Sequence, residues 1–321
     1  MKVLVAGGAG FIGSHLCARL LNEGHDVTCV DSLLTGSERN IAPLRGNSRF
    51  TFLRHDITEP LDIPTDAIFQ LASPASPVGY WMYPFETIRV NTEGTMRLLD
   101  LAHAQGAIFL NASTSEAYGD PLQHPQAETY YGNVNPIGVR ACYDESKRLG
   151  ETITMEYVRR KGVDARVVRI FNTYGPNSQL DDGRMIPNFI TQAILGKPLS
   201  IHGDGSQTRS ICYVDDLVDG LMRALFTAGT TGEVYNLGNP EEHSVLEWAQ
   251  LIIRLCDSTS ELVFESKRED DPERRCPDIE KARTALGWEP HVSPEDGLRR
   301  TIAWFRVEME REGLCQPARA G

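Results

Sequence analysis

A glycine-rich turn between an apolar run and a helix-forming segment constrains this chain more than any other feature. The stretch "VLVAGGAGFIGSHL" (3–16) places Gly7, Gly10 and Gly13 in G-x-x-G-x-x-G spacing directly after an apolar run. Glycines at this spacing let the backbone turn sharply and approach a pyrophosphate, which then lies at the N-terminus of the following helix. The turn therefore predicts a dinucleotide site at the first strand–helix junction of an α/β fold.

The first half of the chain alternates short apolar runs with segments of helical period. The runs are rich in β-branched residues and almost wholly apolar, as strands buried on both faces of a parallel sheet should be. We therefore predict an α/β fold with a doubly wound parallel (Rossmann) sheet. Its expected strands are 3–7, 26–31, 50–57, 67–73, 107–113 and 164–172, and its expected helices are 11–24, 85–106 and 143–161.

After about residue 173 this alternation loosens, and loops separate helices expected near 185–196, 214–228, 244–256 and 294–312. We predict two parts: an NAD-binding Rossmann domain over 1–173, which carries the catalytic groups, and a smaller mixed α/β lobe over 174–321, which binds the substrate. The chain can cross back between them. Substrate is expected in the cleft where the lobe meets the carboxyl edge of the sheet.

Composition narrows the partners and the compartment. A net charge of −12 argues against nucleic acid or an anionic membrane as partner. No apolar run approaches the roughly 20 residues that span a membrane, and Met1 leads almost directly into an apolar strand, so we expect no signal peptide. The seven cysteines form no CxxC pair. We expect reduced thiols, a cytoplasmic protein and no metal site.

Two acidic residues bear on the choice of cofactor. Asp31 follows 18 residues after Gly13 and closes the second predicted strand, where a carboxylate can bind an adenosine ribose hydroxyl. A carboxylate there repels a 2′-phosphate, which favours NAD over NADP. Asp56, at the end of the third predicted strand, is either an adenine contact or a strand-end cap.

The segment "YDESK" places Tyr143 and Lys147 four residues apart, on one face of a helix. A lysine ammonium beside a phenol lowers the pKa of the phenol, and the positive charge of oxidised nicotinamide lowers that pKa further. The phenolate can then take a hydroxyl proton while hydride leaves the same carbon. The hydroxyl of Thr114, which ends a buried run, completes a specific pattern.

These features together resemble the extended short-chain dehydrogenase/reductase family, whose members act on nucleotide sugars. The resemblance extends to about residue 310 and implies that Thr114, Tyr143 and Lys147 form the catalytic triad. The segments that carry it are "LASPASP" (71–77), "STSEAYGDP" (113–121), "HPQAE" (124–128), "NVNPIGVRACYDESKR" (133–148), "RIFNTYGP" (169–176), "GDGSQTR" (203–209) and "RRCPDI" (274–279).

Within this family the segments are most similar to the branch that decarboxylates UDP-glucuronate. The 4,6-dehydratases carry an Asp–Glu pair after the threonine, whereas this chain has Ser115–Glu116, and C4-epimerases usually lack the glutamate. The resemblance implies oxidation at C4, loss of CO2 from the resulting β-keto acid, and reduction to UDP-xylose or release of a UDP-4-keto-pentose. The alternatives are a C4-epimerase, a 4,6-dehydratase and an NAD-sensing binding protein.

The resemblance also implies the remaining site residues and a homodimer built through 85–106 and 143–161. The expected catalytic residues are Thr114, Glu116, Tyr143, Lys147 and Arg275, with Glu116 positioning the ring or a water and Arg275 closing over the site. The expected NAD contacts are Gly7, Gly10, Phe11, Ile12, Gly13, Asp31, Asp56, Ile57, Leu71, Ala72, Tyr143 and Lys147. The expected UDP-sugar contacts are Ser73, Pro74, Ala75, Ser76, Arg89, Asn172, Arg184, Asn188, Arg209 and Arg275.

Overall fold

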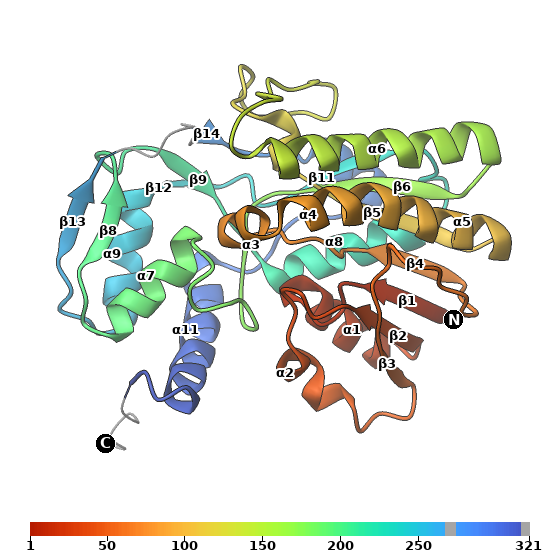
Figure 1. Ribbon diagram of the computed structural model, residues 1–321. Coiled ribbons are helices and arrows are strands. Elements are labelled where there is room, and N and C mark those ends of the chain that lie inside the picture. The colour runs from red at the N-terminus through yellow and green to blue at the C-terminus, as the bar shows by residue number, and fades with distance from the viewer. Residues whose placement is uncertain (267–273, 316–321) are drawn as a thin grey trace.

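A large twisted sheet with helices on both faces lies beside a smaller group of helices and short strands (Figure 1). The structure, a computed structural model, describes residues 1–266 and 274–315. The large sheet has seven strands in the order β11-β6-β5-β4-β1-β2-β3, and every neighbouring pair is parallel. The predicted doubly wound parallel sheet is confirmed. Its strands are β1 (Lys2–Ala6), β2 (Asp26–Asp31), β3 (Phe50–Arg54), β4 (Ala67–Gln70), β5 (Ile108–Thr114), β6 (Ala165–Ile170) and β11 (Val234–Leu237).

Two pairs of helices cover the two faces of the sheet. Helices α1 (Phe11–Asn22) and α8 (Val214–Phe226) pack on one face, and α5 (Thr95–Gln105) and α6 (Ala141–Lys161) pack on the other. Strand β1 shows why the strand sequences are apolar throughout. Val3 and Val5 lie in the core beneath α1 and α8, while Leu4 and Ala6 lie in the separate core beneath α5, so alternate side chains are buried on opposite faces.

The structure differs from the sequence prediction in several places, and one is the expected strand 67–73, which ends at Gln70. Strand β11 was not predicted, because Val234–Leu237 is only four residues long and lies in the loosely patterned part of the chain. The expected helix 85–106 consists of α4 (Pro84–Arg89), a π-helical turn η2 (Val90–Gly94) and α5, with the short α3 (Pro77–Met82) before them. The expected strand 50–57 ends at Arg54, because Asp56 accepts hydrogen bonds from the backbone and hydroxyl of Thr58 and turns the chain.

The smaller lobe combines helices with three short sheets. Helix α11 (Pro294–Arg311) packs against α7 (Met185–Ile194) and α9 (Val245–Leu255). Strand β8 (Leu199–His202) pairs with β13 (Leu262–Glu265), and β9 (Thr208–Ser210) pairs with β12 (Glu242–Ser244) and β14 (Arg274–Arg275). Strand β7 (Thr173–Tyr174) pairs with β10 (Cys212–Tyr213).

The division at residue 173 stays a prediction, and the chain does cross back after it. Helix α8 and strand β11 return to the large sheet, and α10 (Glu280–Leu286) packs against both. The remaining short helices are α2 (Glu38–Ile41), η1 (Ala42–Leu44) and η3 (Ser115–Tyr118). Among the described residues, no helix has the length and apolar composition needed to cross a membrane.

The close packing of α11 gives a test of this arrangement. A Cβ atom at Gly297 would lie 2.1 Å from the Tyr174 hydroxyl oxygen and 2.8 Å from a ring carbon of Tyr213, and both rings are buried. Gly297→Ala should therefore lower the free energy of unfolding by about 1–2 kcal/mol, since overpacking outweighs the helix propensity of alanine. Urea denaturation measures this change. Gly46→Ala is the control, because a Cβ atom at Gly46 meets open space, and equal stability of the two variants would contradict the packing.

Candidate active site

A single cavity of about 1820 Å³ runs between the carboxyl edge of the sheet and the smaller lobe. Ligand pockets commonly hold about 300–1,000 Å³, so this cavity has room for two ligands of nucleotide size. Every residue that the sequence analysis assigned to the site lines it. Their individual roles stay predictions, while their convergence on one cavity is a property of the fold.

The glycine turn lies at the carboxyl end of β1 and allows backbone segments to approach closely. Gly7 has φ +77°, and a Cβ atom there would lie 2.7 Å from the backbone nitrogen of Ala72. A Cβ atom at Gly13 would lie 2.1 Å from the carbonyl oxygen of Gly7. Gly10 begins α1 as its N-cap residue, without a side-chain cap. The first N–H groups of the helix therefore face the cavity as an anion site.

Asp31 lies at the end of β2, beside the glycine turn. Its carboxylate accepts hydrogen bonds from the backbone N–H of Ala9 (3.0 Å) and of Leu33 (2.8 Å). Burial raises the pKa of Asp31, while these two hydrogen bonds oppose the rise. Asp31 thus braces the turn while lining the cavity. Asp56 also lines the cavity, with its carboxylate engaged as a cap by Thr58.

Tyr143 on α6 and Thr114 at the end of β5 both line the cavity, and their side chains are hydrogen-bonded to each other. Burial raises the pKa of Tyr143 to about 12, and a hydrogen bond with the Thr114 side chain opposes this rise. The ring of Tyr80 stacks on that of Tyr143, with centroids 5.1 Å apart and an interplanar angle of 14°. In the protein without cofactor, burial therefore raises the pKa of the Tyr143 phenol more than neighbouring groups lower it. The prediction that protein groups lower this pKa is wrong, and the effect of the oxidised nicotinamide stays a prediction.

Lys147 follows Tyr143 by one helical turn and is buried. Its Nζ lies 5.9 Å from the centroid of the Tyr143 ring and donates a hydrogen bond to the Ala112 carbonyl oxygen (2.8 Å). Burial lowers the pKa of Lys147 to about 7, and the charge of Glu151 opposes that decrease. The ammonium therefore titrates near neutral pH in this environment.

Glu116 on η3 is held by two arginines from distant parts of the chain. Both guanidinium Nη atoms of Arg275 donate to its carboxylate, at 2.6 and 2.8 Å, and Arg140 Nη2 lies 2.6 Å from Oε2. Burial would raise the pKa of Glu116, but Arg275 and Arg140 together hold it below its ordinary value. The carboxylate is therefore ionised, and it forms ion pairs with the guanidinium groups of Arg275 and Arg140.

The remaining predicted contacts surround the space in front of Tyr143. Arg184 Nη2 donates to the carbonyl oxygen of Ala75 (2.8 Å), which joins the smaller lobe to the "SPASP" turn. Ser76 caps α3, since its hydroxyl accepts a hydrogen bond from the Gly79 N–H. Arg89 pairs with Glu93 on the exposed side of η2. Asn172, Asn188 and Arg209 also line the cavity.

Two site residues were not found from the sequence. Arg140 contacts Glu116, and Tyr80 stacks on Tyr143. Arg140 precedes Tyr143 by only three residues, at the N-cap position of α6, and its place beside Tyr143 was the one available signal. Tyr80 lies 63 residues before Tyr143, so its stacking depends on how α3 packs against α6.

The absence of a metal site stays a prediction. Folding brings together ligand atoms of His124, Glu242 and Cys276, which lie within 4.8 Å of one another. Contacts within the protein account for each of these groups. His124 Nε2 lies 2.8 Å from a Glu242 carboxylate oxygen, and the Cys276 thiol donates to the Pro240 carbonyl oxygen at 3.3 Å.

The position of Asp31 predicts cofactor preference. Asp31→Ala should weaken NAD binding about tenfold or more, because the ribose loses an acceptor and the turn loses its brace. The ratio of NAD to NADP affinity should also decrease, since the charge that repels a 2′-phosphate is gone. Titration calorimetry with both dinucleotides measures this. Asp26→Ala, at the exposed opposite end of β2, should bind as wild type, and unchanged NAD affinity in Asp31→Ala would refute the assignment.

Comparison with known proteins identifies the family to which this chain belongs. The model of the NAD dependent epimerase/dehydratase family matches residues 3–238. UDP-glucuronic acid decarboxylase 1 of Xenopus tropicalis is 51% identical over 315 residues, which cover 98% of this chain and 74% of that protein. UDP-glucuronic acid 4-epimerase of Bacillus cereus, solved with UDP-glucuronic acid and NAD, is 31% identical with a TM-score of 0.86, covering 96% of this chain and 100% of that one. dTDP-glucose 4,6-dehydratase of Streptomyces venezuelae, solved with NAD, is 30% identical with a TM-score of 0.87, covering 98% and 100%. The chain belongs to the NAD dependent epimerase/dehydratase family.

Proposed function

We propose that this protein converts UDP-glucuronate to UDP-xylose and CO2 through a 4-keto intermediate, with NAD as a catalytic cofactor. The similarity to UDP-glucuronic acid decarboxylase over nearly the whole chain supports the substrate and the reaction. The single observation that carries the choice within the family is the environment of Glu116. The turn after Thr114 holds one carboxylate, and two arginines keep it ionised.

That environment argues against dehydration. Elimination of a sugar hydroxyl needs an acid that gives the leaving oxygen a proton. Ser115 stands where the dehydratases carry their aspartate, and Glu116, held ionised, has no proton to give. Decarboxylation needs no such acid, because CO2 leaves without a proton.

The oxidation at C4 is assigned to Tyr143. The glycine turn and Asp31 would hold NAD, which would supply reversible hydride transfer at C4. Tyr143 takes the proton of the 4-hydroxyl, and the Lys147 ammonium and the Thr114 hydroxyl favour the phenolate that does so. Thr114 then hydrogen-bonds the C4 oxygen.

The 4-ketone makes the sugar a β-keto acid, which loses CO2 to leave an enolate at C4–C5. Hydrogen-bond donors aimed at the developing oxyanion lower this barrier, and Tyr143 and Thr114 are such donors. The guanidinium of Arg275 lies beside Glu116, on the same wall of the cavity. There it orients the C5 carboxylate until CO2 departs. A proton from a water positioned by Glu116 would replace CO2 at C5. Return of hydride to C4 and of the proton held by Tyr143 to the C4 oxygen would complete UDP-xylose, whereas dissociation of the sugar nucleotide before that reduction would release the 4-keto-pentose.

A second function is C4-epimerisation of the same substrate, which the similarity to the Bacillus cereus epimerase supports. Both reactions begin with the same oxidation at C4. They differ in the fate of the carboxylate, which the epimerase keeps and the decarboxylase loses. Measuring CO2 therefore separates them.

Turnover of UDP-glucuronate tests the proposal directly. A proton NMR time course with UDP-glucuronate and NAD should show UDP-xylose, with one equivalent of CO2 per sugar. Tyr143→Phe should lower kcat by about 10²–10⁴-fold, the usual contribution of a positioned acid or base. Tyr131→Phe, an exposed ring outside the cavity, is the matched control. UDP-galacturonate without CO2 would overturn decarboxylation, and near-normal turnover by Tyr143→Phe would overturn the oxidation step.

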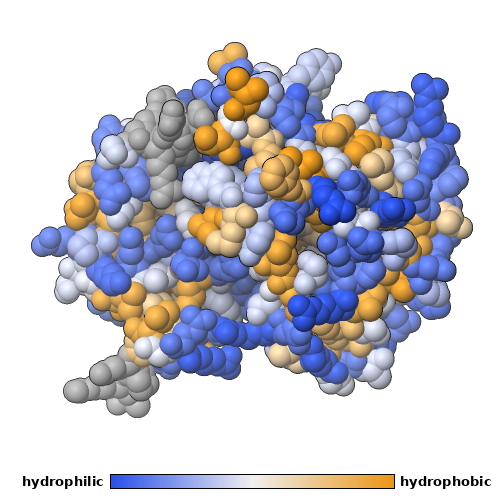
Figure 2. Space-filling model, viewed as in Figure 1, coloured by the Kyte–Doolittle hydropathy of each residue, from blue (hydrophilic) through white to orange (hydrophobic). Residues whose placement is uncertain are grey.

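We also propose a cytoplasmic homodimer that meets through α4, α5 and α6, which span the predicted 85–106 and 143–161. All seven cysteines are free, which suits a reducing compartment. Large apolar side chains are exposed on these helices, and Figure 2 shows hydrophobic surface over α3 and α4 and beside α6. Those outside the cavity are Phe85, Ile88, Met96 and Leu149. Helices α4 and α5 pack on α6 within the chain, so their outer faces form one continuous surface for a second copy.

The dimer proposal is tested by the mass in solution. Phe85, with three-quarters of its surface exposed (75%), should lie in the interface, and Phe85→Glu should convert the dimer to a monomer by burying an unpaired charge. Light scattering coupled to gel filtration measures this. Val307→Glu is the matched control, because it also replaces an exposed apolar residue with glutamate, but on α11. This variant should remain dimeric. A monomeric wild-type protein would refute the proposal.

A further inference from the structure

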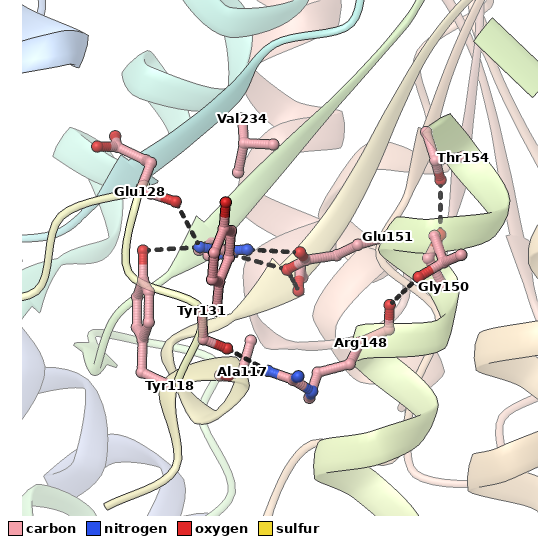
Figure 3. Close-up of polar contacts among 12 residues, drawn as sticks. Ala117, Tyr118, Glu128, Tyr131, Arg148, Gly150, Glu151, Thr154 and Val234 are labelled. Atoms are coloured by element: carbon pink, nitrogen blue, oxygen red, sulfur yellow. Dashed lines mark hydrogen bonds and ion pairs between the residues drawn. The ribbon is translucent and has the colours of Figure 1, made fainter. Parts of the chain in front are cut away.

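A buried ion pair lies behind the catalytic residues and takes no part in the reaction as proposed above. Arg169 on β6 makes a two-pronged contact with Glu151 on α6, with Nε–Oε1 and Nη2–Oε2 distances of 2.9 and 2.7 Å. Both side chains are only 13% exposed. The Ser113 hydroxyl donates to Glu151 Oε1 (2.5 Å), and Arg169 Nη1 donates to the Tyr118 hydroxyl oxygen (3.0 Å). Figure 3 shows Glu151 and Tyr118 pointing toward the same space from α6 and from η3.

The three partners that surround Arg169 in this cluster are close chain neighbours of catalytic groups. Glu151 follows Lys147 by one helical turn, and Ser113 directly precedes Thr114. Tyr118 lies in η3 with Glu116. The ion pair therefore ties together the three elements that carry the triad and Glu116.

The polar contacts continue to the segment that carries Arg275. The Tyr118 hydroxyl donates to Asn236 Oδ1 (2.8 Å), and Asn236 Nδ2 donates to the Gln126 carbonyl oxygen (3.0 Å). Gln126 forms two hydrogen bonds with the backbone of Cys276, both 2.9 Å long, and Cys276 follows Arg275 directly. A chain of hydrogen bonds thus connects α6 to the strand that supplies Arg275.

The charges of this cluster act on Lys147. On α6 the titratable residues within one helical turn of Lys147 are Tyr143, Asp144, Glu145, Arg148 and Glu151. Arg169 on β6 is joined to this group through its ion pair with Glu151. Strand β5 presents the neutral Ala112 carbonyl and the Ser113 and Thr114 hydroxyls. Burial lowers the pKa of Lys147 to about 7, and Glu151 is the carboxylate that raises it. Arg169 brings an opposing positive charge, bonded to that same carboxylate.

We propose that Glu151 is a positioning residue for the oxidation step, which keeps Lys147 in its ammonium form, and that Arg169 orients Glu151 and limits the strength of its effect. The claim that this serves oxidation rests on the proposed function. The claim about the charge of Lys147 does not. The ammonium is the group that favours the Tyr143 phenolate, so its protonation at working pH sets how much enzyme is competent.

The two partners of the ion pair should therefore shift Lys147 in opposite directions. Glu151→Gln removes the negative charge and leaves Arg169 unneutralised, so Lys147 should lose its proton at a pH about one unit lower. Arg169→Gln leaves Glu151 unneutralised, so Lys147 should keep its proton to a higher pH. A purely structural role predicts that both changes act in the same direction.

The experiment follows Lys147 by NMR in protein labelled with ¹³C at the lysine ε carbon and bound to NAD. The chain has only six lysines, and the signal that disappears in Lys147→Met is the one to follow. Glu151→Asp and Arg169→Lys are matched controls that keep each charge while altering the geometry, and their midpoints should stay close to wild type. The high-pH decline of kcat with UDP-glucuronate should move with the midpoint in each variant.

The outcomes separate the claims. Shifts of opposite sign in Glu151→Gln and Arg169→Gln support the proposal. An unchanged midpoint in Glu151→Gln, or shifts of the same sign in both, overturns it. Circular dichroism establishes that each variant is folded, and if Glu151→Gln does not fold, Arg169→Gln against Arg169→Lys still decides the direction. A wild-type protein that leaves UDP-glucuronate unchanged would overturn the proposed function and not the charge assignment, because the NMR midpoint requires no turnover.

Discussion

Parallel strands of one sheet end at the same edge, and the active site depends on that constraint. Strands β1, β4 and β5 deliver Gly7, Ala72 and Thr114 to neighbouring positions, although these residues are far apart in sequence. Because both faces of the sheet are covered by helices, its edge is the place where a large ligand can enter. The smaller lobe closes over this edge, and a cavity with room for both cofactor and sugar nucleotide results.

Within that cavity, desolvation and polar contacts oppose each other at Glu116, Tyr143 and Lys147. Burial alone would neutralise Glu116, but Arg275 and Arg140 keep its carboxylate ionised. Burial likewise raises the pKa of Tyr143 and lowers that of Lys147, which disfavours the charged form of each. Glu151, behind the site, opposes this effect at Lys147, and in the proposed mechanism the positive charge of the oxidised cofactor would favour the Tyr143 phenolate. In the proposed mechanism, activity thus depends on the protonation states of these buried groups, which burial and neighbouring charges set together.

The parts of the site that depend on local spacing could be predicted from the sequence. The glycine turn, Asp31 at the end of β2 and the Tyr143–Lys147 pair each follow from a short pattern, and all of them line the cavity. The residues that were missed depend on tertiary packing. Arg140 meets Glu116 across the cavity, Tyr80 stacks on Tyr143 from another helix, and strand β11 is too short to recognise outside the sheet that it extends.

The sequence by itself determined the fold class, the cofactor turn and the chemical identity of the catalytic groups. It did so because backbone geometry at glycine, burial of apolar strands and helical spacing are properties of neighbouring residues. Only the tertiary structure decided the charge states. The clamp on Glu116 joins residues 24 and 159 positions away, and the Arg169–Glu151 pair joins a strand to a helix. Electrostatic energies depend on distance and solvent exposure, which the chain acquires only when it folds.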